Sequence, residues 1–221
     1  MKKILVLAAC LTLLAAGAAQ GATTLNIGGT FSHDIFMTGP GGAVTEGGGS
    51  IETSYLNGTM LPYLYCVDIG TTVYVPGSYA QTVVTTTGHV YGSLVNNATQ
   101  VAWLLHEYGV SGQGDNAKAL QASIWSLTNP GYTMNQSLAP AAQYSLYTTY
   151  LASIPTTFND ANNFIDDFFW ITPGTLDTNG NLVQYQALVA PTPIPGTVML
   201  MASGLAGLIG IARFRRKRSA N

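Results

Sequence analysis

The sequence predicts an α+β fold, in which a β-sandwich or barrel-like domain carries a helical insertion. Segments rich in β-forming residues lie towards both ends of the central region, and segments with helical spacing occupy its middle. An uncharged apolar segment near each end of the 221-residue chain sets the limits of the domain. We therefore expect one domain at 22–190, between a leading segment at 1–21 and a trailing segment at 191–221.

The leading segment has the order of regions found in a signal peptide. Residues 2–3 are lysines, residues 4–19 form an apolar run, and small residues follow at Gly21 and Ala22. We expect cleavage after Gly21 or Ala22, and therefore an exported protein. An N-terminal spanning helix is disfavoured because no stop-transfer charges follow. Lipid attachment at Cys10 is disfavoured because too little apolar sequence precedes it.

The trailing segment predicts a transmembrane sorting helix. Three prolines break the chain, and residues 197–212 are 16 residues without a charge. This length is marginal, because a spanning helix usually needs about 20 apolar residues. A basic cluster follows, which would hold the end on the cytoplasmic side. The residues that would form the sorting signal are Pro193, Pro195, Arg213, Arg215, Arg216, Lys217 and Arg218. A plain anchor without processing is the alternative.

These features resemble the PEP-CTERM sorting signal of Gram-negative, often biofilm-forming bacteria. The likeness lies in Pro193-Ile194-Pro195-Gly196, the stretch Ser-Gly-Leu-Ala-Gly-Leu at 203–208 and the basic cluster. Isoleucine stands between the prolines, where the usual signal has glutamate. The resemblance implies processing by an exosortase near the prolines and transient anchoring in the inner membrane. It also implies final location at the cell envelope, the outer surface or the extracellular matrix.

The charge of the central region excludes one class of partner. Of the eight lysines and arginines, two lie in the leading segment and five in the basic cluster, which leaves only Lys118. All ten acidic residues lie between Asp34 and Asp177, so the exported part has a formal net charge of −9. Nucleic-acid binding needs a basic surface and is not expected. The acidic stretches lack the spacing of an EF-hand, so we expect no metal and no cofactor.

The central region divides into strands, helices and strands. We expect strands at 24–27, 50–55, 63–69, 81–84 and 182–189. A Gly-rich loop is expected at 39–49, and Asn179-Gly180 is typical of a hairpin turn. Apolar residues at helical spacing predict helices at 97–108, 116–127 and 139–151.

Two residues suggest a specific chemistry. Cys66 is the only cysteine left after removal of the signal peptide, in a compartment where cysteines usually pair. Gln121 stands inside the apolar stripe of a predicted helix, where a carboxamide without partners is costly. A thiolate can attack a carboxamide and expel ammonia, which leaves an internal thioester. An inert buried cysteine and a glutamine bonded to a neighbouring loop or strand are the alternatives.

Three segments resemble the thioester domains of bacterial surface adhesins. They are Tyr65-Cys66-Val67-Asp68, Val101-Ala102-Trp103-Leu104-Leu105 and Leu120-Gln121-Ala122-Ser123-Ile124-Trp125. The resemblance implies that Cys66 and Gln121 form the bond. It also implies covalent attachment to an amine- or hydroxyl-bearing target, for adhesion. Because Gln121 would be consumed, the chain would be a single-use acyl donor and not an enzyme.

Several residues are secondary candidates. His106, beside Glu107, is the best placed of three histidines to assist proton transfer, and Asp68 would lie on the same strand face as Cys66. Lys118, one turn before Gln121, would either orient the site or quench it. We hypothesise that lysine is depleted to avoid self-crosslinking. A cysteine hydrolase using Cys66 with a histidine is one alternative, and a passive structural protein of a biofilm matrix is another.

Overall fold

The computed structural model describes residues 23–29 and 31–193. The predicted signal peptide lies outside the described residues, and so does most of the predicted sorting segment, from residue 194 onward. Within the described ranges, no helix is long and apolar enough to cross a membrane.

The chain order of the elements is strands, then helices, then strands. The first strands are β1 (Thr23–Ile27), β2 (Ser32–Gly39), β3 (Gly42–Gly48), β4 (Tyr55–Leu56), β5 (Thr59–Met60), β6 (Tyr65–Cys66), β7 (Gly77–Thr85), β8 (His89–Val90) and β9 (Ser93–Leu94). The middle contains α2 (Ala98–Tyr108), α3 (Asp115–Thr128), β10 (Thr133–Met134) and α4 (Ala141–Ser153). A short 3-10 helix, η2 (Ile165–Asp167), precedes β11 (Phe168–Thr172), β12 (Gly174–Leu176), β13 (Leu182–Gln184) and β14 (Leu188–Pro191).

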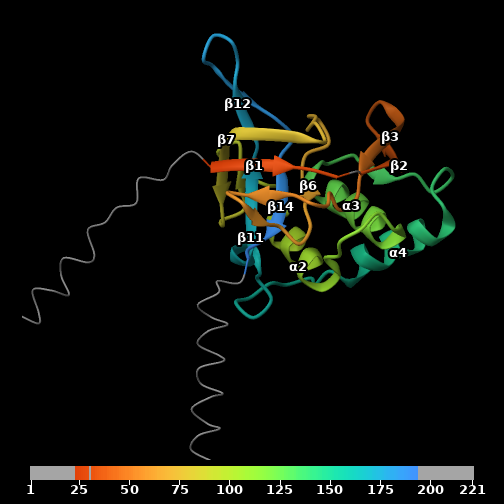
Figure 1. The fold of residues 1–221 in the computed structure, drawn as a ribbon. Coiled ribbons are helices and arrows are strands. Elements are labelled where there is room, and N and C mark those ends of the chain that lie inside the picture. Colours follow the sequence, from red (N-terminus) through yellow and green to blue (C-terminus); the bar gives the residue numbers. More distant parts are fainter. Residues whose placement is uncertain (1–22, 30, 194–221) are drawn as a thin grey trace, which may run out of the picture.

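An antiparallel sheet of seven strands forms the framework, in the order β5-β4-β1-β7-β11-β14-β6, and curls into a half-barrel (Figure 1). At its centre, Ile171 of β11 lies opposite Val84 of β7 and opposite Leu188 of β14. Trp170, Ile171 and Leu188 are fully buried. Because β6 is the last strand, one of its edges is left without a neighbouring strand of this sheet.

The helices gather beside the β6 end of the sheet, with α3 between α2 and α4 (Figure 1). Helix α3 also contacts β6 of the large sheet and β2 and β10 of a second sheet, whose order is β10-β2-β3. Most of α3 is therefore buried, including Leu120, Gln121 and Ile124. The helical insertion predicted between the strands is confirmed, and each predicted helix agrees with the observed one to within a few residues.

The strand predictions were less accurate. Strands at 24–27 and 81–84 are confirmed as parts of β1 and β7, whereas the strand predicted at 63–69 shrinks to the two residues of β6. The strand at 50–55 was wrong except at its last residue, because Thr53 has φ 57° and interrupts an extended chain. The strand at 182–189 is split, since Tyr185 and Gln186 donate their N–H groups to Pro173 and Thr72 outside the ladder.

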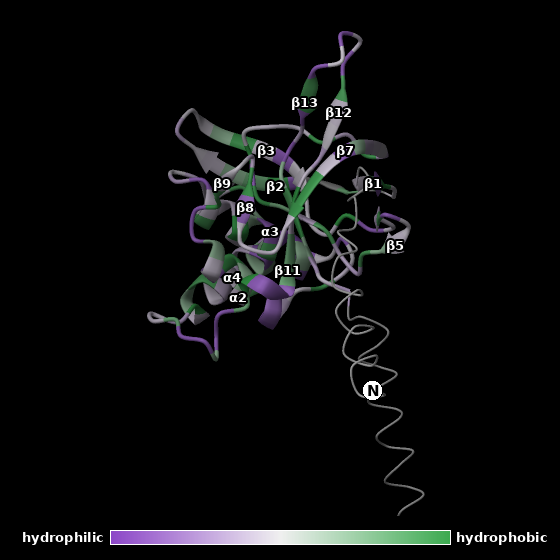
Figure 2. Ribbon diagram, turned by 90° about the vertical axis from the view of Figure 1, so that its left-hand side faces the viewer, coloured by the Kyte–Doolittle hydropathy of each residue, from purple (hydrophilic) through white to green (hydrophobic). Residues whose placement is uncertain are grey.

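The predicted Gly-rich loop at 39–49 was also wrong, because β2 and β3 form a hairpin there. Gly42, at φ 109°, begins β3 in a backbone conformation that favours glycine. The turn at Asn179-Gly180 is confirmed between β12 and β13, with Gly180 at φ 80°. Figure 2 shows this β12–β13 hairpin projecting from the body of the domain, with a hydrophilic tip.

Two leucines near the end of the chain test how the sheet depends on β14. Leu188 is fully buried, whereas Leu182 of β13 is 50% exposed. We expect Leu188→Ala to lower the free energy of unfolding by about 2–5 kcal/mol, because it leaves a cavity at the junction of β11, β14 and β6. Leu182→Ala should change it by less than about 0.5 kcal/mol. Urea unfolding of the two purified variants measures both; equal losses would contradict the central place of β14.

Candidate functional site

The site lies where the free edge of β6 meets α3. Cys66 is 2% exposed and Gln121 is fully buried, although the two residues are 55 positions apart in the sequence. Leu188 of β14 lies opposite Cys66, and the N–H of Val67 donates to Ala187 O at 2.9 Å. In an antiparallel pair the backbone groups of successive residues point to alternate sides. The N–H and C=O of Cys66 therefore point away from β14, towards α3.

Gln121 satisfies both of these backbone groups. The Cys66 N–H donates to Gln121 Oε1 at 2.9 Å, and Gln121 Nε2 donates to Cys66 O at 2.7 Å. The carboxamide takes the place of a peptide group on a neighbouring strand, which explains how a glutamine is accommodated inside an apolar helix stripe. These two bonds hold the carboxamide beside the backbone of Cys66. Its oxygen rests on a backbone N–H, the type of donor that stabilises a developing oxyanion.

The β2–β3 hairpin packs closely against the Gln121 side chain. A Cβ at Gly48 would lie 2.8 Å from Gln121 Cγ and 2.9 Å from Trp125 Cη2. These contacts are too short for any side chain, so glycine at this position lets β3 approach α3 closely. The sequence predicted a loop here, but Gly48, the last residue of β3, packs against the Gln121 side chain.

Burial strongly affects the thiol. It raises the pKa of Cys66 from an ordinary value of 9.0 to about 12, with a smaller contribution from the negative charge of Asp68. Because each pH unit below the pKa lowers the ionised fraction tenfold, about one thiol in 100,000 is ionised at pH 7. Cys66 is a free cysteine in this structure. The site therefore favours neutral forms of the sulfur.

A second glutamine contacts the sulfur itself. Gln186 lies just before β14, and its Oε1 accepts a hydrogen bond from Cys66 Sγ at 3.4 Å. Its Nε2 donates to Asp68 O, and its own N–H donates to Thr72 O at 3.3 Å. Sequence analysis missed this residue, because its position depends on contacts 120 residues apart. The available signal was a glutamine at the start of the apolar run Ala187–Ala190.

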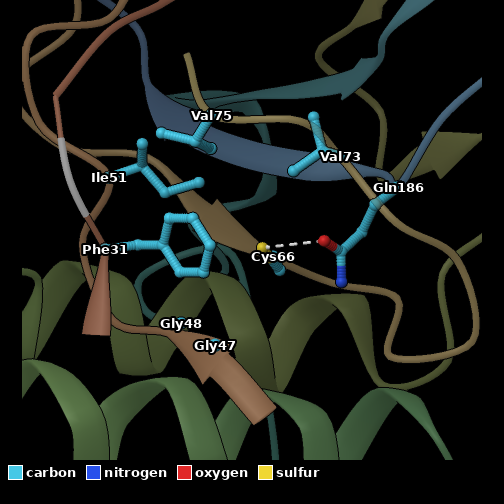
Figure 3. A pocket seen from close by; sticks show the side chains of 8 residues that line it. All are labelled: Phe31, Gly47, Gly48, Ile51, Cys66, Val73, Val75 and Gln186. Atoms are coloured by element: carbon cyan, nitrogen blue, oxygen red, sulfur yellow. Dashed lines mark hydrogen bonds between the residues drawn. The ribbon is translucent and has the colours of Figure 1, made fainter. Parts of the chain in front are cut away.

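A small pocket opens at the sulfur (Figure 3). Its cavity volume is about 20 Å³, room for little more than one water molecule and far less than the roughly 300–1,000 Å³ of pockets that enclose small-molecule ligands. Apart from Cys66 and Gln186, it is lined by glycine and apolar residues, namely Phe31, Gly47, Gly48, Ile51, Val73 and Val75. The pocket is therefore small and mostly apolar, and it presents one polar side chain, Gln186, beside the thiol.

Asp68 supports the site from outside the pocket. Its Oδ1 accepts the Gly70 N–H at 2.7 Å, and its Oδ2 accepts the hydroxyl groups of Thr71 and Tyr91. The side chain thus stabilises the turn that follows β6. Its backbone oxygen holds the Gln186 carboxamide, so the expected ordering role acts through Gln186.

Two other predicted residues are placed in different surroundings. His106 is exposed on α2, and its ring stacks on Phe164 with centroids 3.6 Å apart. The Lys118 ammonium forms an ion pair with Asp34 at 2.8 Å, with 13% of the lysine side chain exposed. Neither residue lines the pocket at Cys66.

The hydrolase alternative needs an imidazole beside the thiol. His106 stacks on Phe164, and His89 Nδ1 lies 2.8 Å from Thr87 O. A nucleophilic cysteine also needs a lowered pKa, whereas the pKa of Cys66 is raised. The geometry of these groups does not favour hydrolysis by Cys66. In the part of the chain that is described, no group of three metal-ligating side chains comes together.

Comparison with known proteins adds no assignment. No protein-family model, no curated protein and no solved structure matches this chain.

The raised thiol pKa has a measurable consequence. A Gln121→Met variant cannot form a thioester. At pH 8, iodoacetamide should alkylate its Cys66 about 100-fold more slowly than in the urea-unfolded chain. The ionised fraction is about 1,000-fold smaller, but a thiolate of higher pKa is intrinsically more nucleophilic. The rate should rise about tenfold per pH unit from pH 8 to 11, because the folded-state pKa is about 12. In the unfolded chain the rate should level off just above pH 9. Levelling at that pH in the folded variant would contradict the burial argument.

Proposed function

We propose that this chain is an exported protein of a Gram-negative cell surface or extracellular matrix, in which Cys66 and Gln121 form an internal thioester. The thioester attaches the protein covalently to partners that bear amines or hydroxyls. One observation carries the proposal: the Gln121 carboxamide is held against Cys66 by two hydrogen bonds, with Oε1 on the Cys66 N–H.

Formation of the bond follows from this placement. Cys66 Sγ attacks Gln121 Cδ, and the Cys66 N–H stabilises Oε1 as it gains negative charge. The C–N bond then breaks, and the thiol proton leaves with the amide nitrogen as ammonia. Both the thiol and the thioester are neutral, so burial, which disfavours the thiolate, does not disfavour the product. A thiolate population this small makes formation slow, which a single event per molecule tolerates.

Use of the bond consumes Gln121. An amine forms a C–N bond to Gln121 Cδ, the C–S bond breaks, and a proton from the nitrogen passes to Cys66 Sγ. A thiol of high pKa is a poor leaving group, so the unused bond should persist. The protein is thus a single-use acyl donor.

The charge of the domain favours an amine as the partner. The described residues contain all ten acidic side chains, one lysine and no arginine. A negative surface raises the local concentration of cationic amines. The one lysine is ion-paired with Asp34, which keeps its amine engaged and is consistent with lysine depletion as protection against self-crosslinking.

Delivery to the surface rests on the two ends of the chain. The PEP-CTERM-like segment would be processed by an exosortase after transient anchoring in the inner membrane. Pro193 is the last described residue, and the rest of the sorting signal lies outside the described part.

A passive structural protein of a biofilm matrix is the second candidate. The observation that favours it is the buried thiol with a pKa of about 12, which is unreactive at neutral pH. In that case Gln121 would serve only to complete the edge of β6.

Intact mass distinguishes the two candidates. We expect the purified protein to be about 17 Da lighter than its sequence, because ammonia is lost, and methylamine to add about 31 Da to this form. Peptide mapping should place the methylamide at Gln121. The Cys66→Ala and Gln121→Met variants should each have the full mass of their sequence and should take up no methylamine. A wild-type mass equal to the sequence, with one titratable thiol, would leave the structural candidate standing; a methylamide at Gln186 would reassign the acyl donor.

Two glycines of one hairpin test the placement of Gln121. We expect Gly48→Ala to lower the fraction of protein carrying the thioester by at least about tenfold. The added methyl group would lie only 2.8 Å from Gln121 Cγ and would therefore push the side chain out of position. Gly41→Ala is the matched control, since its Cβ would meet nothing within 4 Å. The fraction is read from the ammonia deficit in intact mass. Equal fractions in the two variants would show that β3 does not position the carboxamide.

A further inference from the structure

The pocket at Cys66 contains a hydrogen-bond acceptor whose partner disappears when the thioester forms. Across the described residues, the Cys66 thiol is the one donor to Gln186 Oε1. A thioester sulfur carries no proton, so this oxygen loses its donor. Gln186 is 8% exposed, and an unsatisfied acceptor in an apolar surrounding is costly. The thioester form therefore has an unfilled acceptor beside the reactive carbonyl.

The orientation of this acceptor is fixed. Asp68 O can only accept, so the Gln186 nitrogen must face it and the Gln186 oxygen must face the sulfur. Asp68 is itself held by Gly70 and Tyr91, and the Gln186 N–H is bonded to Thr72 O at 3.3 Å. The carboxamide cannot turn to offer its NH₂ group to the pocket without placing two oxygens together.

We propose, on the basis of the thioester function above, that Gln186 is the residue that receives the incoming nucleophile, a small primary amine. Its Oε1 accepts an N–H of the amine in the pocket, which aims the nitrogen lone pair at Gln121 Cδ. The cavity of about 20 Å³ between Phe31, Ile51, Val73 and Val75 favours an amine with a very small carbon substituent, such as a methyl group (Figure 3).

This assignment gives Gln186 a role through the whole transfer. As nitrogen bonds to Gln121 Cδ it gains positive charge, which strengthens its hydrogen bond to Gln186 Oε1. The C–S bond then breaks, and one nitrogen proton passes to Cys66 Sγ. The restored thiol again donates to Gln186 Oε1, as in the structure. A primary amine has a second N–H, so one hydrogen can stay bonded to Gln186 while the other is lost.

The test compares a nucleophile that has N–H donors with one that has none. Methylamine and ethanethiolate are both small nucleophiles, but the thiolate has no hydrogen to donate. We expect Gln186→Leu to react with methylamine at least about tenfold more slowly than the wild type. Its reaction with ethanethiolate at pH 9 should be as fast or faster, because an electron-rich oxygen has been removed. Gln184→Leu, at an exposed position of β13, is the matched control and should change neither rate.

A conservative variant guards against a merely structural effect. Gln186→Glu keeps an acceptor oxygen in either protonation state, so its methylamine-to-thiolate rate ratio should equal or exceed that of the wild type. Equal slowing of both nucleophiles in Gln186→Leu, or an unchanged ratio, overturns the proposal. Loss of the thioester mass in both variants also overturns it, since Gln186 would then serve bond formation. The wild-type mass is measured first, so the absence of a thioester there counts against the proposed function and is distinguished from failure of the Gln186 role.

Discussion

The pairing of the Gln121 carboxamide with the backbone of Cys66 is the interaction on which the rest of the site depends. Strand β6 has only two residues and lies at the edge of the sheet, so its outward N–H and C=O need partners. A side chain from α3 supplies both, which joins the helices to the sheet. The same two bonds hold the carboxamide beside the residue that carries the thiol. Completion of the strand edge and the placement on which the proposed thioester depends are thus one feature.

The surroundings of Cys66 and Gln121 disfavour the charged thiolate relative to neutral forms of the sulfur. Gly48 lets β3 cover Gln121 without a gap, and the apolar pocket walls remove water from the sulfur. Charge is disfavoured in such surroundings, whereas a neutral acyl group is not. Among the described residues, Gln186 is the polar side chain that contacts the sulfur itself, and its orientation depends on the turn that Asp68 stabilises. The proposed chemistry therefore depends on a few buried polar groups in an apolar surrounding.

Much of this arrangement can be predicted from the sequence, for identifiable physical reasons. The first two helices have clear periodicity, the third has a weaker pattern, and Gln121 stands out because it interrupts an apolar stripe. The hairpin β2–β3 was missed because its glycines carry no side chains from which alternation can be recognised. Strand β11 was not predicted, although Phe168–Thr172 has the aromatic and β-branched residues of a strand. Gln186 could not be identified from the sequence, since it is placed by contacts with Asp68 and Cys66, which lie well over 100 residues earlier.

The raised thiol pKa separates single-use chemistry from turnover. A cysteine hydrolase must regenerate its nucleophile in every cycle, which requires a readily ionised thiol and an adjacent base. Cys66 is 2% exposed, and burial raises its pKa to about 12. An acyl donor that acts once needs the opposite properties: slow formation is tolerated, and a poor leaving group protects the bond from water until a well-placed amine arrives. The burial that makes Cys66 a poor catalyst is therefore what a durable thioester requires.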